Sequence, residues 1–103
     1  MSETKWTIIS SNKALDFISK EYNKLDNYKD GLGERFYDRV EEVYARIKDN
    51  PLQFEKKTEI YRKGLVNVGK KIQYAIYFRI EENEVYVDLI LPTSINPDFH
   101  PSD

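Results

Sequence analysis

The basic side chains of this sequence gather in one segment, and a cluster of cations can bind phosphates or carboxylates. Between Gln53 and Arg79 the chain has seven Lys or Arg and two Glu, which gives a local charge of +5. The other residues include nine basic and 16 acidic side chains, a charge of −7, within a net charge of −2. The segment is therefore a candidate docking surface for a polyanion or an acidic peptide. The alternative is a solvated sheet face.

Most other kinds of site lack the residues they need. The sequence has no cysteine, which excludes disulfides and thiolate metal sites. Its one histidine, His100, has no clustered carboxylates or cysteines to complete a metal site, and we expect it in a mobile tail. Gly31 and Gly33 are not followed by the Lys-Ser/Thr of a phosphate loop. The sequence therefore predicts no cofactor and no metal.

Length and composition indicate one folded domain. A chain of 103 residues suits a single domain over 1–103, with a loose tail at 96–103. No apolar run approaches the ~20 residues that cross a bilayer, and the first residues lack the shape of a signal peptide. We expect a cytoplasmic protein that makes no membrane contact.

The first half of the chain predicts a strand and two helices. Residues 6–9 form the strand, and Ser11 or Asn12 can cap the helix that follows. The apolar residues of this first helix are spaced three or four positions apart, so they share one helix face. They are Ala14, Leu15, Ile18, Tyr22 and Leu25. A second helix begins near Leu32 or Gly33 and ends at Asn50-Pro51. Its apolar stripe is Phe36, Val40, Val43, Tyr44 and Ile47.

The second half predicts strands. Residues 54–57 form a short one, and residues 61–68 form another that is interrupted by Gly64 and ends at Gly69. Residues 72–80 alternate strictly between apolar and other side chains, and a polar turn follows at 81–84. In the last strand Val85, Val87, Leu89 and Leu91 alternate with Tyr86, Asp88 and Ile90. This order predicts an α+β fold, in which an N-terminal strand and a helical hairpin combine with an antiparallel sheet that the helices cover on one face.

Four motifs along the chain carry a family resemblance. They are Gly31-Leu32-Gly33-Glu34-Arg35-Phe36, the Asn50-Pro51 stop, Tyr61-Arg62-Lys63, and Tyr74-Ala75-Ile76-Tyr77-Phe78-Arg79-Ile80. In this order and spacing, over roughly residues 6–97, they resemble the ParE branch of the ParE/RelE toxin superfamily. The resemblance implies the toxin of a type II toxin–antitoxin pair with a ParE/RelE-like fold.

Two modes of action occur in that superfamily. RelE-like members cut mRNA on the ribosome, which requires cations at the phosphate and a group that moves the 2′-OH proton. Here Ala75 stands where that branch has an arginine, and residues 92–96 contain no cation. The resemblance therefore implies a ParE-like protein that is not an enzyme and acts by binding, with DNA gyrase as the target that such members inhibit.

Two alternatives stay open, because Pro92, Ser94 and Ile95 stand where the ParE branch commonly has a His and one or two Arg. One is a RelE-like ribosome-dependent mRNA endoribonuclease. The other is a degenerate, non-toxic homologue that keeps only the fold and antitoxin binding.

The resemblance also implies a partner, a cognate antitoxin whose disordered arm folds on binding. Such arms are acidic, so we predict that the basic segment carries the contact, through Lys56, Lys57, Tyr61, Arg62, Lys63, Lys70, Lys71, Tyr77 and Arg79. Arg79 could instead pair with Asp88 or Glu84 on the next strand. Aromatic residues at strand spacing are more often half-buried sheet residues than base-stacking platforms, so we expect no direct nucleic-acid site.

Overall fold

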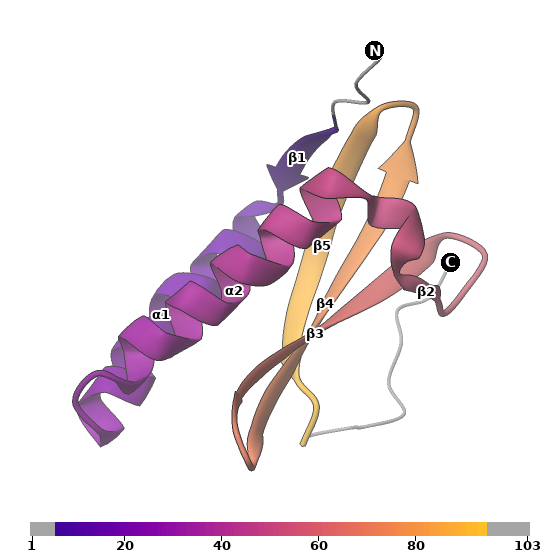
Figure 1. Cartoon of the computed structure of the whole chain (residues 1–103). Helices are drawn as coiled ribbons and strands as arrows, with labels where there is room; N and C mark the ends of the chain where they lie inside the picture. The colour runs from indigo at the N-terminus through magenta and orange to yellow at the C-terminus, as the bar shows by residue number, and fades with distance from the viewer. Residues whose placement is uncertain (1–5, 95–103) are drawn as a thin grey trace.

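The computed structural model describes residues 6–94 as two helices packed on one face of a five-stranded sheet (Figure 1). The elements in chain order are β1 (Thr7–Ser10), α1 (Asn12–Tyr28), α2 (Leu32–Asp49), the short 3₁₀ helix η1 (Pro51–Gln53), β2 (Glu55–Lys56), β3 (Tyr61–Gly69), β4 (Ile72–Glu81) and β5 (Glu84–Pro92). The α+β fold class is confirmed. The predictions for the tail at 96–103, including His100, and for Ile95 lie outside the described residues.

The strand order is β1-β5-β4-β3-β2, and one pairing differs from the prediction. The sheet is mixed, because β1 runs parallel to β5 while the other pairs are antiparallel. A parallel neighbour requires a long crossover rather than a hairpin. The helical hairpin and three further strands supply it, since they separate β1 from β5 along the chain.

Helix α1 begins as predicted, and of its predicted apolar stripe Ala14 and Leu25 are buried and Ile18 packs against the core. Ser11 caps it, because its side-chain oxygen accepts a hydrogen bond from the N–H of Ala14 at 3.0 Å. The prediction that Leu15 belongs to the buried stripe is wrong, since this side chain is 52% exposed. Phe17 packs against the core instead, with its ring edge-on to Tyr74 at 5.9 Å. Phe17 thus adds to the core a contact that the predicted stripe does not include.

The turn between the helices depends on Asp26 and two glycines. The Oδ1 atom of Asp26 accepts hydrogen bonds from the N–H groups of Gly31 at 3.1 Å and Gly33 at 3.0 Å. Gly31 adopts a left-handed backbone with φ of 83°, a conformation that favours glycine. At Gly33 a Cβ atom would overlap the carbonyl oxygen of Tyr22. The two helices therefore lie in close contact at Gly33, with no room for a side chain.

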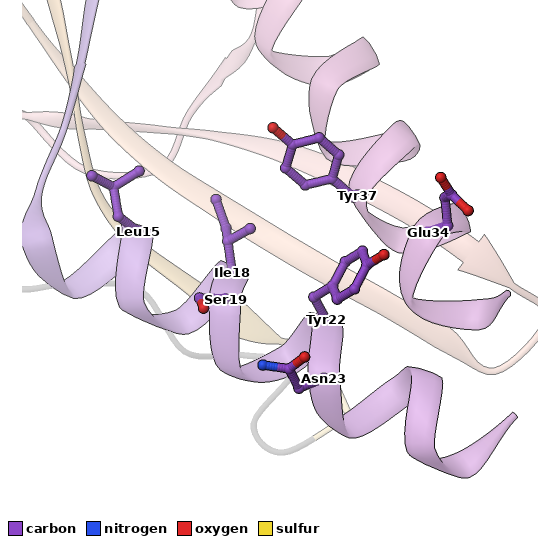
Figure 2. A pocket seen from close by; sticks show the side chains of 7 residues that line it. All are labelled: Leu15, Ile18, Ser19, Tyr22, Asn23, Glu34 and Tyr37. Atoms are coloured by element: carbon purple, nitrogen blue, oxygen red, sulfur yellow. The ribbon is translucent and has the colours of Figure 1, made fainter. Parts of the chain in front are cut away.

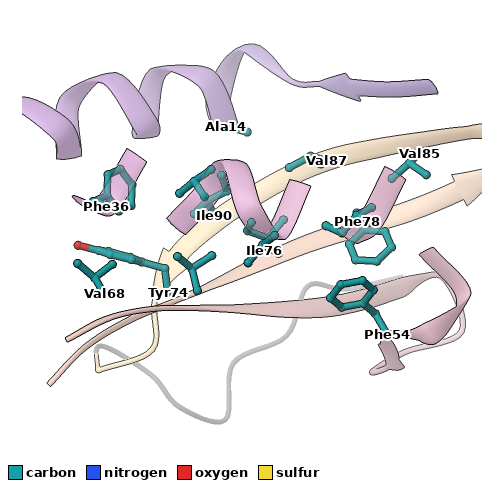
Figure 3. Close-up of a cluster of buried hydrophobic side chains, with 14 of the residues drawn as sticks. Ala14, Phe36, Phe54, Val68, Tyr74, Ile76, Phe78, Val85, Val87 and Ile90 are labelled. Carbon is teal, nitrogen blue, oxygen red and sulfur yellow. The ribbon is translucent and has the colours of Figure 1, made fainter. Parts of the chain in front are cut away.

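The core lies between the helices and the sheet, and the predicted stripe of α2 is confirmed. Figure 3 shows Phe36 of this stripe beside Tyr74 of β4. Phe36 is fully buried with its ring edge-on to Tyr74 at 4.8 Å. Strand β3 runs through Gly64 without the predicted interruption. A Cβ at Gly64 would lie 3.1 Å from the Phe54 ring, so the glycine allows this ring to pack on the strand.

The β4–β5 pairing contains a bulge that changes which residues face the core. Tyr77 is opposite Leu89 and Phe78 is opposite Val87, so Asp88 is an extra residue in β5. The predicted alternation therefore fails after Val87, because Ile90 rather than Leu89 becomes buried. Among residues 6–94 no helix is both long and apolar enough to cross a membrane.

Candidate partner-binding surface

Four of the nine predicted contact residues lie together on the sheet face opposite the helices. Tyr61 and Lys63 of β3 are in register with Arg79 and Tyr77 of β4. Figure 1 shows that α1 and α2 cover one face of the sheet. Because side chains alternate along a strand and the buried Gly64 and Phe78 lie on the covered face, all four residues point to the opposite face. The Lys63 ammonium lies 5.9 Å from the centre of the Tyr77 ring. We call this group of four residues the outer-face cluster.

The bulge in β5 adds Asp88 to the outer-face cluster. Its Oδ2 atom accepts hydrogen bonds from the Tyr61 hydroxyl and from Nε of Arg79, each at 2.8 Å. The backbone of Asp88 is bound by the residue that caps α1, since the Ser11 hydroxyl donates to the carbonyl oxygen of Asp88 at 3.1 Å. The bulge therefore aims one carboxylate at two predicted contact residues.

The positive charge of Arg79 is balanced by neighbouring carboxylates of this chain, of which Asp88 is one. Its guanidinium also pairs with Glu81 and lies over the Tyr86 ring at 4.5 Å. The hydrogen bond to Asp88 raises the pKa of Arg79, and the same carboxylate raises the pKa of Tyr61. Both groups are held in their protonated forms by neighbouring carboxylates. Arg79 thus pairs with Asp88, as one of the two sequence-based alternatives predicts.

Tyr77 is the most buried member of the outer-face cluster, with 2% of its surface exposed. Burial raises the pKa of its hydroxyl. The side chain lies between Lys63 on one neighbouring strand and Leu89 on the other. Its ring therefore contributes mainly a packed platform for the cation of Lys63.

Three other predicted contact residues lie elsewhere along the β2 edge. Arg62 points to the helix side, where Nη1 donates to the carbonyl oxygen of Phe54 at 2.8 Å. Lys56 is opposite Arg62 in the register, and Lys57 pairs with Glu55 at 3.3 Å. Arg62 therefore binds the segment after η1 to the sheet. Its side chain lies on the opposite face from the outer-face cluster.

Lys70 and Lys71 lie at the far end of the β3–β4 hairpin. Eight residue steps separate Tyr61 from Gly69, which is about 26 Å of extended chain. Both lysines are exposed at the turn. The basic segment of the sequence is thus divided among the outer-face cluster, the β2 edge and this turn.

Tyr74 and Ala75, the positions that bear on a RelE-like ribonuclease site, lie near the start of β4. Ala75 is buried on the outer face, in register with Leu65 and Leu91. The Tyr74 hydroxyl donates to Glu21 at 2.7 Å, and burial together with this bond raises its pKa well above 10. A cleft of about 270 Å³ at this end is lined by Glu21, Lys24, Leu25, Lys71, Ile72, Gln73, Tyr74, Pro92 and Ser94. Such a tyrosine is a poor proton acceptor at neutral pH.

The helical hairpin carries a groove on its exposed side. Leu15, Ile18 and Tyr22 of α1 and Tyr37 of α2 are among the residues that line a cavity of about 500 Å³. Figure 2 shows how these side chains lie. The rings of Tyr22 and Tyr37 meet edge-on at 6.4 Å. The exposure of Leu15, which the sequence places in the core, helps to form this groove.

Sequence reasoning missed two groups of residues near these surfaces. Asp88 was considered only as a partner of Arg79, because the bulge that presents it to Tyr61 leaves no sequence signal. Three arginines of α2, Arg35, Arg39 and Arg46, are not among the contact residues that the sequence predicts. Their spacing of four and seven residues could have shown that they share one helix face.

Comparison with known proteins shows a likeness of fold. No family model matches the chain, and no curated protein matches it. Among solved structures, the fold is similar to a chain of the chromosomal ParDE toxin–antitoxin system from P. aeruginosa. The TM-score is 0.68 at 11% sequence identity, and the match covers 87% of this chain and 98% of that chain. The likeness is one of fold.

Proposed function

We propose that this chain is the toxin of a type II toxin–antitoxin pair, of the ParE kind, and that a cognate antitoxin neutralises it. The observation that carries the proposal is the fold likeness, which takes in 98% of a chain from a ParDE system. The four ordered sequence motifs support the same assignment independently of the coordinates.

The toxin acts by binding rather than by catalysis in this proposal, and DNA gyrase is its target. The polar side chains that could serve catalysis have hydrogen-bond or ion-pair partners within this chain, which supports a binding role. Arg79 is paired with two carboxylates, while Tyr61 and Tyr74 each donate to one. A ribonuclease would need such cations and hydroxyls directed at a phosphate and a 2′-OH.

Controlled expression in a bacterial host tests the proposal. Expression of the chain alone should arrest growth, and co-expression of the product of the adjacent gene should restore it. Purified chain should inhibit DNA supercoiling by gyrase, and the adjacent gene product should relieve the inhibition. Normal growth at full expression would contradict a toxin and favour the degenerate homologue.

A RelE-like ribonuclease is the second candidate, and one observation favours it. The cleft beside Tyr74 contains Lys24 and Lys71, two cations near a tyrosine. Ribosomes programmed with a defined mRNA test this candidate. Cleavage at codon positions that is lost in Lys71→Gln and Tyr74→Phe would replace the binding mechanism with an enzymatic one.

A further inference from the structure

Two hydrogen-bond donors of the outer-face cluster converge on a single oxygen atom. Oδ2 of Asp88 accepts from the Tyr61 hydroxyl and from Nε of Arg79, each at 2.8 Å. The three residues come from β3, β4 and β5, which are neighbours in the sheet. Donors that converge from separate strands, one of them charged, form the kind of site that binds an oxyanion. In this molecule the anion is a side chain of the same chain.

The two donors are oriented by contacts that do not involve Asp88. The Arg79 guanidinium also pairs with Glu81 through Nη1, and it lies over the Tyr86 ring at 4.5 Å. Tyr61 is held by its strand, in register with Arg79. Both donors therefore remain directed at the same point when the carboxylate moves away, which is the preorganisation that a binding site needs.

The carboxylate of Asp88 can leave this point without disturbing the sheet. The backbone of the bulge is bound by Ser11, whose N–H donates to the carbonyl oxygen of Val87 at 2.9 Å and whose hydroxyl donates to that of Asp88 at 3.1 Å. The side chains of Asp88 and Arg79 are each 27% exposed, so solvent reaches the ion pair. A change of the χ1 rotamer of Asp88 therefore opens the site while the main chain keeps its bonds.

Lys63 provides a second cation beside the site. It is the diagonal neighbour of Arg79 on the adjacent strand, an arrangement in which the Cβ atoms lie about 7 Å apart. Among residues 6–94 no carboxylate lies within 4.0 Å of its ammonium group, which instead lies over the Tyr77 ring. Asp88 thus leaves one cation of the outer-face cluster without a carboxylate in the described part of the chain.

We propose that Asp88 is an autoinhibitory residue whose carboxylate fills a phosphate-binding site formed by Tyr61, Lys63 and Arg79. A phosphate group suits these donors better than a carboxylate, because its tetrahedrally arranged oxygens accept from several directions and can reach both cations. Asp88 competes with the phosphate for Tyr61 and Arg79, so the site is closed until the carboxylate rotates away. This inference does not depend on the proposed function.

Titration of the full ¹⁵N-labelled chain with inorganic phosphate at constant ionic strength tests the site. Phosphate should shift the amide signals of Lys63 and Arg79 and the Nε–H signal of Arg79. Asp88→Ala should bind phosphate about tenfold more tightly than the wild-type chain, because its donors are no longer shared with a carboxylate. Acetate, the carboxylate probe, should bind Asp88→Ala at least about tenfold more weakly than phosphate.

A matched control separates the site from the effect of net charge. Glu42→Gln also removes one negative charge, and it releases Arg39 from an ion pair of 3.2 Å on the surface of α2. This variant should bind phosphate within about twofold of the wild-type affinity, because a single exposed cation holds an anion weakly.

The donors are tested in the Asp88→Ala background. Arg79→Gln and Lys63→Gln should each weaken phosphate binding about tenfold, whereas Lys48→Gln, which removes an exposed cation of α2, should not. If Asp88→Ala does not fold, Asp88→Asn removes the same charge with the same shape and replaces it throughout the series.

A second probe distinguishes the sources of the phosphate group. A thymidine dinucleotide contains one phosphate, which is a diester. Binding of this probe to Asp88→Ala as tightly as inorganic phosphate would assign the site to a nucleic-acid backbone. Binding of inorganic phosphate alone would assign it to a small phosphate compound.

Three results would overturn the inference. Equal phosphate affinity of the wild-type chain and Asp88→Ala would mean that Asp88 only forms a structural ion pair. An equal gain in Glu42→Gln would mean that net charge alone governs binding. Acetate that binds as tightly as phosphate would exclude a phosphate site.

Discussion

Replacing Gly33 by alanine tests how closely α1 and α2 pack. Gly33 lies in the first turn of α2, so alanine gains there at most the about 1 kcal/mol by which it is favoured over glycine in a helix interior. Here a Cβ would overlap the backbone carbonyl oxygen of Tyr22 and lie 3.1 Å from the Cβ of Asp26. The backbone cannot swing aside, so the helices must separate, at about 2–3 kcal/mol. The Gly33 N–H would also lose its bond to Asp26, worth about 1 kcal/mol. Gly33→Ala should therefore lower the free energy of unfolding by about 2–3 kcal/mol.

Two other glycines provide matched controls. A Cβ at Gly69 would meet no atom within 4 Å, so Gly69→Ala should change the free energy of unfolding by less than about 0.5 kcal/mol. Gly31 has equal space but a φ of 83°, so Gly31→Ala should cost about 1–2 kcal/mol through backbone strain alone.

Urea unfolding followed by circular dichroism, with equal m-values across the series, measures all three variants. A neutral or stabilised Gly33→Ala variant would refute the close approach of the two helices.

Further predictions concern the core, the bulge and the alkaline limit of stability. Phe36→Ala should cost about 3–5 kcal/mol in urea melts because its ring is fully buried, whereas Leu15→Ala should change stability by less than about 0.5 kcal/mol; a loss at Leu15→Ala as large as that at Phe36→Ala would mean that Leu15 is buried. Asp88→Asn should cost about 1–2 kcal/mol, since its charge is shared by two hydrogen-bond donors, and thermal melts that show no loss would contradict the network. The raised pKa of Tyr74 means that protonated Tyr74 contributes fully to stability below pH 10, and that this contribution is lost as pH rises through the folded-state pKa. Tyr74→Phe should therefore flatten the fall in Tm above pH 10, and an unchanged slope would count against this assignment.

Local sequence patterns were sufficient for the secondary structure and for the core face of α2. The stripe from Phe36 to Ile47 is read directly from the 3.6-residue period, and Ser11 marks a helix start by its own hydrogen-bond chemistry. The α+β layering follows because amphipathic helices and half-apolar strands must cover each other. These features depend on residues close together in the chain.

The tertiary structure alone decided the features that depend on distant contacts. A bulge at Asp88 adds one residue to β5, which turns Ile90 inward and brings a carboxylate to Tyr61 across the intervening strand β4. No local sequence period encodes this bulge. Leu15 is exposed because the packing of α1 on the sheet sets its rotation, and apolar spacing alone allows several rotations. The basic segment looks continuous in sequence, yet strand alternation and the length of the β3–β4 hairpin divide its cations among separate surfaces. The sequence thus determined which elements form, while long-range packing determined which side chains meet.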